Sequence, residues 1–189
     1  MSLVRDQNSR RRIIRAASCA FARKGYHPVT MREIGRNGRV NLPTIYYFFG
    51  SKEGLFEAAL LTVHDSVMQN LRLTVPDRSL DREMRSLLEA TLRYHAAHPN
   101  DMQLVFRLVY SAPLKIRRKY LRGPGREFPD LLDECFRRHP LPPGERWRQE
   151  CIRALFSSLV LKLSLPDIDS TEISRIRRSL KRLVRRPPV

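Results

Sequence analysis

The stretch NLPTIYYFFGSKEGL, residues 41–55, combines residue types that suit a surface for nucleic acid. Tyr46 and Tyr47 carry aromatic rings with a polar tip, within an unbroken run of four aromatics that is either a piece of core or a surface that touches something. Lys52 follows Gly and Ser at the expected start of a helix, where an ammonium group and the helix amides together favour a phosphate. The stretch therefore indicates a helix with one face toward a polyanion and the other toward the core.

The overall charge favours the same kind of partner. The chain has 189 residues, with 36 Lys and Arg against 19 Asp and Glu, a net charge of +17. Such a balance indicates nucleic acid or an anionic membrane, although a basic surface can also be merely solvated. In residues 1–50, ten cations face only Asp6 and Glu33, a net charge of +8. The ten are Arg5, Arg10, Arg11, Arg12, Arg15, Arg23, Lys24, Arg32, Arg36 and Arg39.

Composition and periodicity indicate a globular, all-α protein of about nine helices. With 42% apolar and 29% charged residues, the chain can bury a proper core. Nearly every segment repeats its apolar residues with a period of about 3.6, and none alternates convincingly as a strand. Clusters of Gly and Pro separate the segments. The candidate helices are 9–24, short ones after Thr30 and after Asn41, 51–73, 81–97, 100–111, 113–121, 126–138, 144–164 and 170–186.

No targeting or membrane-spanning segment is expected. The first residues, MSLVRDQNSRRRII, lack the apolar run of a signal peptide, and no stretch approaches the roughly 18 apolar residues that span a bilayer. Cys19, Cys135 and Cys151 are odd in number and far apart, which indicates buried free thiols in a reducing compartment. We therefore expect a cytoplasmic protein without a membrane partner.

The first 50 residues fit three short helices with a tight turn between the second and the third. This is the helix-turn-helix arrangement, in which the third helix enters the DNA major groove and the second crosses the backbone. Thr30 and Glu33 form a T-x-x-E capping box for the second helix. Ile45 and Phe49, four residues apart on the third helix, are expected to face inward against Phe21.

Residues from Ile13 to about Leu60 resemble the TetR family of bacterial transcriptional regulators. Two segments carry the resemblance, AASCAFARKGYHPVTMREIG and VNLPTIYYFFGSKEGLFEAAL. The resemblance implies a helix-turn-helix domain over residues 1–53 and a helical domain over 54–189 that dimerises and binds a small-molecule effector. It also implies a homodimer on a palindromic operator in double-stranded DNA, acting as a nucleoid-associated bacterial repressor that the effector releases. The matching positions are Phe21, Gly25, Thr30, Ile34, Val40, Tyr46, Phe49, Lys52, Glu53 and Leu55.

The resemblance also assigns DNA contacts to particular residues of the helix-turn-helix. Arg32 is placed to reach a guanine edge, and Thr44 with its neighbours opens the recognition helix toward base edges. Lys52 is placed to hold a phosphate. The alternative for Arg32 and Lys52 is an ordinary solvated charge. The predicted DNA-binding residues are Arg32, Asn41, Leu42, Pro43, Thr44, Tyr46, Tyr47 and Lys52.

Two positions depart from the family pattern. At the turn the family commonly has Ala-Gly-Val, whereas this chain has Gly38, Arg39 and Val40. Either Gly38 turns the chain one residue early, or Arg39 adopts the left-handed conformation at a cost of about 1–2 kcal/mol and is aimed at phosphate. Phe48 stands where the family commonly has His or Tyr, so a phosphate contact is expected to be missing there.

The C-terminal helices are expected to provide an effector pocket and a dimer interface, although apolar stripes at helical spacing also fit a plain core. Arg107 lies within an apolar run and needs a partner, which makes an anionic effector a hypothesis. His64, His95 and His98 lack a compact metal-ligand spacing, so no metal is expected. The predicted pocket residues are Tyr94, His95, Met102, Phe106, Arg107 and Tyr110. The predicted interface residues are Trp147, Leu155, Leu159, Ile173, Ile176 and Leu180.

Two features leave other functions open. The basic tail RIRRSLKRLVRRPPV, from Arg175 onward, fits a dimer helix with a charged outer face, a membrane-surface helix or a site for an acidic protein. The overall charge also fits a protein that binds nucleic acid or a membrane surface without sequence preference. An enzyme carrying a helix-turn-helix is disfavoured, since the chain has no phosphate-cradling Gly loop, no H-E-x-x-H motif and no paired nucleophile and base. We expect neither catalysis nor a cofactor.

Overall fold

All regular structure in the described part of the chain is helical, with ten α-helices and two short 3-10 helices. The all-α prediction is confirmed, and each of the ten candidate segments corresponds to one α-helix. The end of the basic tail, beyond Val184, lies outside the described residues. The computed structural model describes residues 2–74, 76–163, 165 and 169–184, and only the backbone of residues 2–5 and 108–110.

The chain forms two compact units. Unit 1 contains residues 1–66 and 100–124, and unit 2 contains residues 67–99 and 125–189. Helix α4 (Lys52–Arg72) contributes to both of them. These two units are defined by contacts within the chain and not by function. The expected division into a DNA-binding domain and an effector domain at residue 53 therefore stays a prediction.

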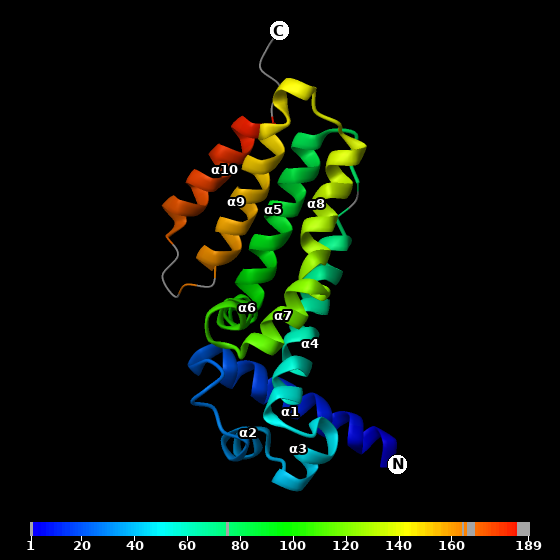
Figure 1. Cartoon of the computed structure of the whole chain (residues 1–189), viewed down its shortest axis with the longest axis vertical. Coiled ribbons are helices and arrows are strands. Elements are labelled where there is room, and N and C mark those ends of the chain that lie inside the picture. Colours follow the sequence, from blue (N-terminus) through cyan, green and yellow to red (C-terminus); the bar gives the residue numbers. More distant parts are fainter. Residues whose placement is uncertain (1, 75, 164, 166–168, 185–189) are drawn as a thin grey trace. The chain divides into compact units, whose positions relative to one another are not determined.

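In unit 1, helix α1 lies across α2 and α3 (Figure 1). Ile13, Ala17 and Phe21 on the inner face of α1 are fully buried, as are Ile34 of α2 and Ile45 of α3. Burial of a large apolar side chain contributes about 1.5–3 kcal/mol, so this core holds the three helices together. The helices of unit 1 are α1 (Ser2–Lys24), α2 (Met31–Gly38), α3 (Leu42–Phe49), the first part of α4, most of α6 (Pro99–Ser111) and α7 (Leu114–Arg122).

Local capping signals set where these helices begin and end. The side chain of Thr30 accepts the N–H of Glu33 at 3.2 Å, and the side chain of Asn41 accepts the N–H of Thr44 at 3.0 Å. The two bonds cap the starts of α2 and α3. Gly25, with φ of 80°, follows α1 in the left-handed conformation that favours glycine. The expected starts of α2 and α3 and the expected end of α1 are therefore confirmed.

Two expectations for this unit are wrong in detail. Helix α1 begins at Ser2 rather than near Ser9, so the helix extends beyond the apolar stripe that predicted it. Phe49 was expected to face inward, but its ring is half-buried and the guanidinium carbon of Arg10 lies 5.7 Å from the ring centroid. Ile45 is the one buried residue of α3.

The turn between α2 and α3 decides between the alternatives for Gly38 and Arg39. Arg39 has φ of 51° and ψ of 47°, so this residue adopts the left-handed conformation, and Gly38 remains the last residue of α2. The backbone N–H of Arg39 donates to the carbonyl of Arg36 at 3.2 Å. The guanidinium of Arg12 donates to the carbonyl of Arg39 at 2.8 Å, and these bonds offset the strain of the turn.

In unit 2, helices α5, α8, α9 and α10 run alongside one another (Figure 1). Met84 and Leu87 of α5 and Phe156 and Leu159 of α9 are all buried and belong to the core of this unit. Arg177 of α10 forms a two-pronged ion pair with Glu89 of α5, at 2.9 and 2.8 Å. Besides the end of α4, the helices are α5 (Leu80–Ala97), α8 (Glu127–Arg138), α9 (Trp147–Leu163), α10 (Ser170–Val184) and the 3-10 helices η1 (Pro124–Arg126) and η2 (Pro143–Glu145).

Candidate nucleic-acid interface

Helix α3 has an exposed aromatic face. The side chains of Tyr46 and Tyr47 are 49% and 80% exposed, whereas Ile45 on the other side of the helix is fully buried. Phe48 is half-buried, with its ring centroid 5.2 Å from that of Tyr47. Packing within the chain gives no reason for two large rings to lie in water, so this face is a candidate contact surface.

Asn41 and Thr44, both predicted to contact DNA, are bound to each other at the start of α3. Besides the backbone bond that caps the helix, the hydroxyl of Thr44 donates to the Asn41 carbonyl oxygen of the side chain. This pair fixes the entry into α3 and leaves both residues accessible at its N-terminus, where backbone N–H groups favour anions. Arg32, also predicted, is exposed in the first turn of α2 and has no ion pair among the described residues.

Lys52, the predicted phosphate contact, is half-buried against the loop between α1 and α2. Its ammonium group donates to the carbonyl of His27 at 3.0 Å and lies 4.5 Å from the ring centroid of Tyr26. Burial lowers the pKa of Lys52, while the neighbouring Glu53 carboxylate acts in the opposite direction. The Tyr26 hydroxyl donates to Glu53 at 2.7 Å, and this bond lowers the pKa of Glu53. Lys52 therefore joins the start of α4 to that loop, in addition to any contact with DNA.

Most cations of the helix-turn-helix are unbalanced by carboxylates. Glu33 pairs with Lys24 at 2.5 Å, and this hydrogen bond lowers the pKa of Glu33. Exposed cations without a counter-charge generate a positive field that attracts polyanions. The arginines of this segment that are exposed and form no ion pair among the described residues are Arg10, Arg11, Arg12, Arg15, Arg23, Arg32, Arg36 and Arg39.

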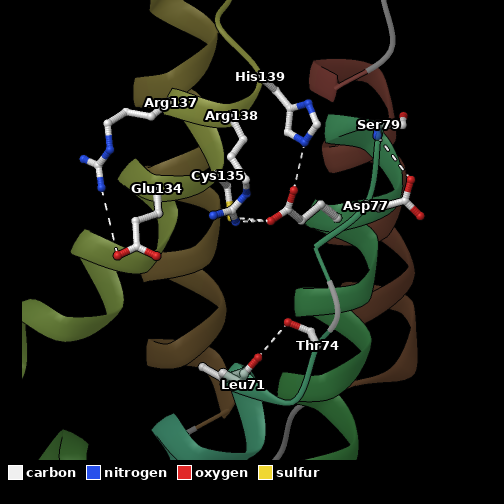
Figure 2. A network of polar contacts seen from close by, with 10 residues as sticks. Leu71, Thr74, Asp77, Ser79, Glu134, Cys135, Arg137, Arg138 and His139 are labelled. Carbon is white, nitrogen blue, oxygen red and sulfur yellow. Dashed lines mark hydrogen bonds and ion pairs between the residues drawn. The ribbon is translucent and has the colours of Figure 1, made fainter.

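Unit 2 contains a polar cavity of about 420 Å³ between the end of α4, α5 and α8. The buried carboxylate of Glu83 accepts hydrogen bonds there from the guanidinium of Arg138 and, at 3.1 Å, from the thiol of Cys135. Its second oxygen lies 2.9 Å from Nε2 of His139. Figure 2 shows Cys135, Arg138 and His139 converging from the end of α8. Sequence reasoning missed this cluster, because Glu83 lies far from its partners along the chain.

In this cluster, the pKa of the Glu83 carboxyl is lowered and the pKa of the neighbouring Cys135 thiol is raised. Burial alone would raise the pKa of Glu83, but the hydrogen bonds from Arg138, Cys135 and His139 outweigh it and lower that pKa. Burial and the adjacent Glu83 carboxylate raise the pKa of Cys135 to about 12. Cys135 is therefore a protonated donor rather than a reactive thiolate. It is a buried free thiol, as expected, whereas the free thiols of Cys19 and Cys151 are only partly buried.

Arg107 has partners within the protein, which removes the reason for expecting an anionic effector. Its guanidinium donates to the carbonyls of Ala22 and Arg23 at 3.4 and 3.5 Å, at the end of α1. A cation at a helix C-terminus stabilises the exposed carbonyls and the helix dipole. Arg107 thus docks α6 onto α1 within unit 1.

The other predicted pocket residues belong to both units, and their grouping stays a prediction. Tyr94 is buried and His95 half-buried in unit 2, whereas Met102 is buried and Phe106 half-buried in unit 1. The side chain of Tyr110 lies outside the described residues. None of the described five lines the cavity beside Glu83.

The predicted interface residues divide between the core and the surface of unit 2. Leu159, Ile176 and Leu180 are buried within the chain, and Leu155 and Ile173 are partly buried. Trp147 at the start of α9 is 59% exposed. The exposed residues of α9 are Trp147, Glu150, Ala154, Ser157 and Leu161, so small and apolar side chains share this face with one carboxylate, which pairs with Arg153.

Two kinds of site are absent from the part of the chain that the structure describes. No group of three or more His, Cys, Asp or Glu side chains could hold a metal ion there. No described helix has both the length and the apolar composition needed to cross a membrane.

Comparison with known proteins agrees with the helix-turn-helix geometry. Residues 13–59 match the model of bacterial regulatory proteins of the tetR family. The chain is 35% identical over 95 residues to the HTH-type transcriptional repressor SCO4008 of Streptomyces coelicolor, covering 50% of this chain and 46% of that protein. It is 30% identical over 105 residues to the HTH-type transcriptional activator FasR of Mycolicibacterium smegmatis, covering 55% of this chain and 48% of that protein.

The fold extends the likeness over nearly the whole chain. The structure of the fatty acid degradation regulator FadR from Bacillus halodurans superimposes with a TM-score of 0.75 at 17% identity, covering 93% of this chain and 94% of that one. An N-terminal helix-turn-helix followed by a helical domain defines a class of bacterial regulators. Residues 13–59 of this chain therefore match the tetR family, while the likeness of the remaining helices to such regulators is one of fold alone. Its matched segments span about half the length of the relatives named above.

Proposed function

We propose that this chain is a DNA-binding transcriptional regulator that reads its operator with α3. The observation that carries the proposal is the exposed face of Tyr46 and Tyr47 on a helix whose start is capped by Asn41. A helix in this position of a helix-turn-helix enters the major groove, where polar and aromatic side chains reach base edges and backbone. The unpaired arginines of α2, Arg32 and Arg36, supply contacts to phosphate. The proposal places the protein in the bacterial cytoplasm.

The regulator acts as a homodimer on a palindromic operator. Two recognition helices must lie roughly 34–36 Å apart to read adjacent major grooves, which a single chain cannot provide. The exposed side of α9 supports a dimer, because Ala154 and Ser157 allow a second helix to approach closely between Trp147 and Leu161. Trp147 and the partly buried Leu155 and Ile173 are the predicted interface residues with surface left to contribute.

A small-molecule effector releases the operator, and the cavity beside Glu83 supports this part of the proposal. Its volume of about 420 Å³ is in the range of pockets for small ligands, and it combines apolar walls with convergent polar groups. An effector can shift the protein only through a different affinity for the bound and released states. One relative is named a repressor, which favours repression, but another is named an activator. An experiment must therefore also measure whether transcription falls or rises when the protein binds.

Competition binding tests the DNA-reading part of the proposal. The operator is first located by genomic footprinting, and its affinity is then compared with random duplex at two salt concentrations. We expect a preference of about 10³-fold or more for the palindrome. Replacement of Arg32 or Thr44 by Ala should reduce this preference. Equal affinity for both duplexes, with only the steep salt dependence of counterion release, would show a non-specific basic protein instead.

A further inference from the structure

A groove of about 800 Å³ lies between α1 and the C-terminal half of α2, entirely within unit 1. Its floor consists of the small side chains of Ala16, Cys19 and Ala20, together with Gly38 of α2. The backbone of Gly38 approaches α1 so closely that a β-carbon there would lie 3.5 Å from the β-carbon of Ala16. This close packing at one end and the small floor residues leave an open channel along α1.

The rim of the groove is almost wholly cationic. It carries Arg12, Arg15, Arg23 and Lys24 of α1 and Arg39 of the turn, against the single carboxylate of Glu33. The carboxylate is already taken, because Lys24 pairs with it at 2.5 Å. Four guanidinium groups, those of Arg12, Arg15, Arg23 and Arg39, have no ion pair among the described residues, although that of Arg12 donates to the carbonyl of Arg39. Concentrated positive charge without counter-charge favours an anionic occupant.

The side-chain chemistry selects phosphate over other anions. Guanidinium groups offer paired, planar N–H donors that match the oxygens of a phosphate, and these charge-assisted bonds are strong. From Arg12 to Arg23 the groove follows α1 for about 16 Å, at 1.5 Å per residue. This is longer than one phosphate can span, so the cations can be engaged together only by a ligand with two or more phosphates.

The position of the groove disfavours the operator itself as the occupant. Ile45, on the inner side of α3, lies against α2, since its Cδ1 is 3.3 Å from the position of a β-carbon on Gly35. Tyr46 and Tyr47 point to the opposite, exposed side of α3. DNA seated on those tyrosines would be separated from the α1 groove by the width of a helix, about 10 Å. A concave channel also fits a small ligand better than a convex duplex.

We propose that the groove between α1 and α2 binds a small ligand that carries two or more phosphate groups, such as a nucleoside polyphosphate. Phosphates bind along the rim to Arg15, Arg23 and Arg39, and the rest of the ligand lies over the small side chains of the floor. This site is distinct from the α3 surface and from the cavity beside Glu83. It goes beyond the proposed function, and its test needs no operator.

Calorimetric titration of the full chain with inorganic tripolyphosphate and with ATP tests the site. At about 150 mM salt, where loose surface attraction is screened, we expect saturable binding of one ligand per chain. The double variant Arg15→Gln, Arg23→Gln should bind at least about tenfold more weakly, through loss of two charge-assisted contacts. The matched control is Arg178→Gln, Arg182→Gln on the exposed side of α10, which removes the same charge and should bind like the wild type.

Three results would overturn the proposal. The first is the absence of saturable binding to either probe. The second is an equal loss of ligand affinity in the groove variant and in the α10 variant. The third is a groove variant that binds random duplex DNA more weakly, while tripolyphosphate does not compete with that DNA for the wild type. The second would show a bulk charge effect, and the third would assign the groove to the nucleic-acid backbone. Because Arg15 and Arg23 are exposed, both single variants should fold, and each should weaken binding of tripolyphosphate by about threefold or more.

Discussion

The ammonium nitrogen of Lys52 lies 4.5 Å from the ring centroid of Tyr26 and donates a 3.0 Å hydrogen bond to the carbonyl of His27. A lysine over an aromatic face is stabilised by the ring quadrupole, more so where water is partly excluded. The residue predicted to hold a phosphate is therefore also part of the packing between the α1–α2 loop and α4. A mutation of Lys52 can weaken DNA binding either by removing the charge that holds a phosphate or by disturbing this packing. A variant that removes the charge and keeps the shape of the side chain separates the two causes.

Replacement of Lys52 by Met keeps an unbranched side chain over Tyr26 and removes the charge. We expect the free energy of unfolding to fall by about 1 kcal/mol, from loss of the ring contact and the hydrogen bond. Affinity should fall equally for operator and random DNA, and the slope of log affinity against log salt should drop by about 1. Denaturant unfolding and DNA titration at several salt concentrations measure these effects.

The control for this variant is Lys181→Met on the exposed side of α10, which removes the same charge far along the chain from the helix-turn-helix. It should leave both the salt slope and the stability nearly unchanged. An unchanged salt slope in Lys52→Met would mean that Lys52 has only its structural role.

Asn41 can be tested for its two roles in the same way. Asn41→Ala removes the acceptor for the Thr44 N–H, and loss of a helix cap costs about 1 kcal/mol of stability. Asn41→Asp keeps an acceptor at the same place, so stability should stay within about 0.5 kcal/mol of the wild type. Its carboxylate should nevertheless weaken DNA binding by repelling phosphate. If Asn41→Asp bound the operator as well as the wild type, the predicted DNA contact of Asn41 would be wrong.

The features predicted correctly from the sequence are those that local chemistry decides. Thr30 and Asn41 cap helices with residues three positions away, and Gly25 ends a helix by its own backbone freedom. The exposed side of α3 also followed from helical periodicity, because Tyr46 and Tyr47 leave the face that Ile45 buries. Such signals need no knowledge of the rest of the fold.

The features that were missed depend on contacts between distant parts of the chain. Arg107 was assigned to a ligand because its partners, the carbonyls of Ala22 and Arg23, lie 85 and 84 residues earlier. In the sequence, Glu83 is one charged residue among several in its helix. Its partner Arg138 lies 55 residues later and comes beside it only through the packing of α8. No periodicity or capping rule reports a pairing of this kind.

Arg39→Gly tests the strain in the helix-turn-helix. Arg39 has φ of 51°, a conformation that costs an ordinary L-residue about 1–2 kcal/mol and glycine almost nothing. Part of this gain is lost because glycine is more disordered when unfolded, so we expect stabilisation by about 0.5–1 kcal/mol. The Arg12 hydrogen bond persists, since it ends on a backbone carbonyl. The control, Arg36→Gly within α2, removes the same charge and should destabilise by about 1 kcal/mol in the same denaturant titration. Equal destabilisation by both variants would contradict the strain.

Glu83→Gln tests the buried cluster of unit 2 through its pH dependence. We expect a loss of about 2 kcal/mol in unfolding free energy near neutral pH, because Arg138 loses its charged acceptor. The pKa of Glu83 is lowered on folding, so the carboxylate stabilises the folded chain fully above its ordinary pKa of 4.5. That contribution disappears as the pH falls through the lower, folded pKa. Denaturant unfolding between neutral and acidic pH should therefore show the difference between wild type and variant shrinking below that value. Glu134→Gln, an exposed change on the same helix as Arg138, should alter stability by less than about 0.5 kcal/mol. A difference that stayed constant with falling pH would contradict a stabilising carboxylate at Glu83.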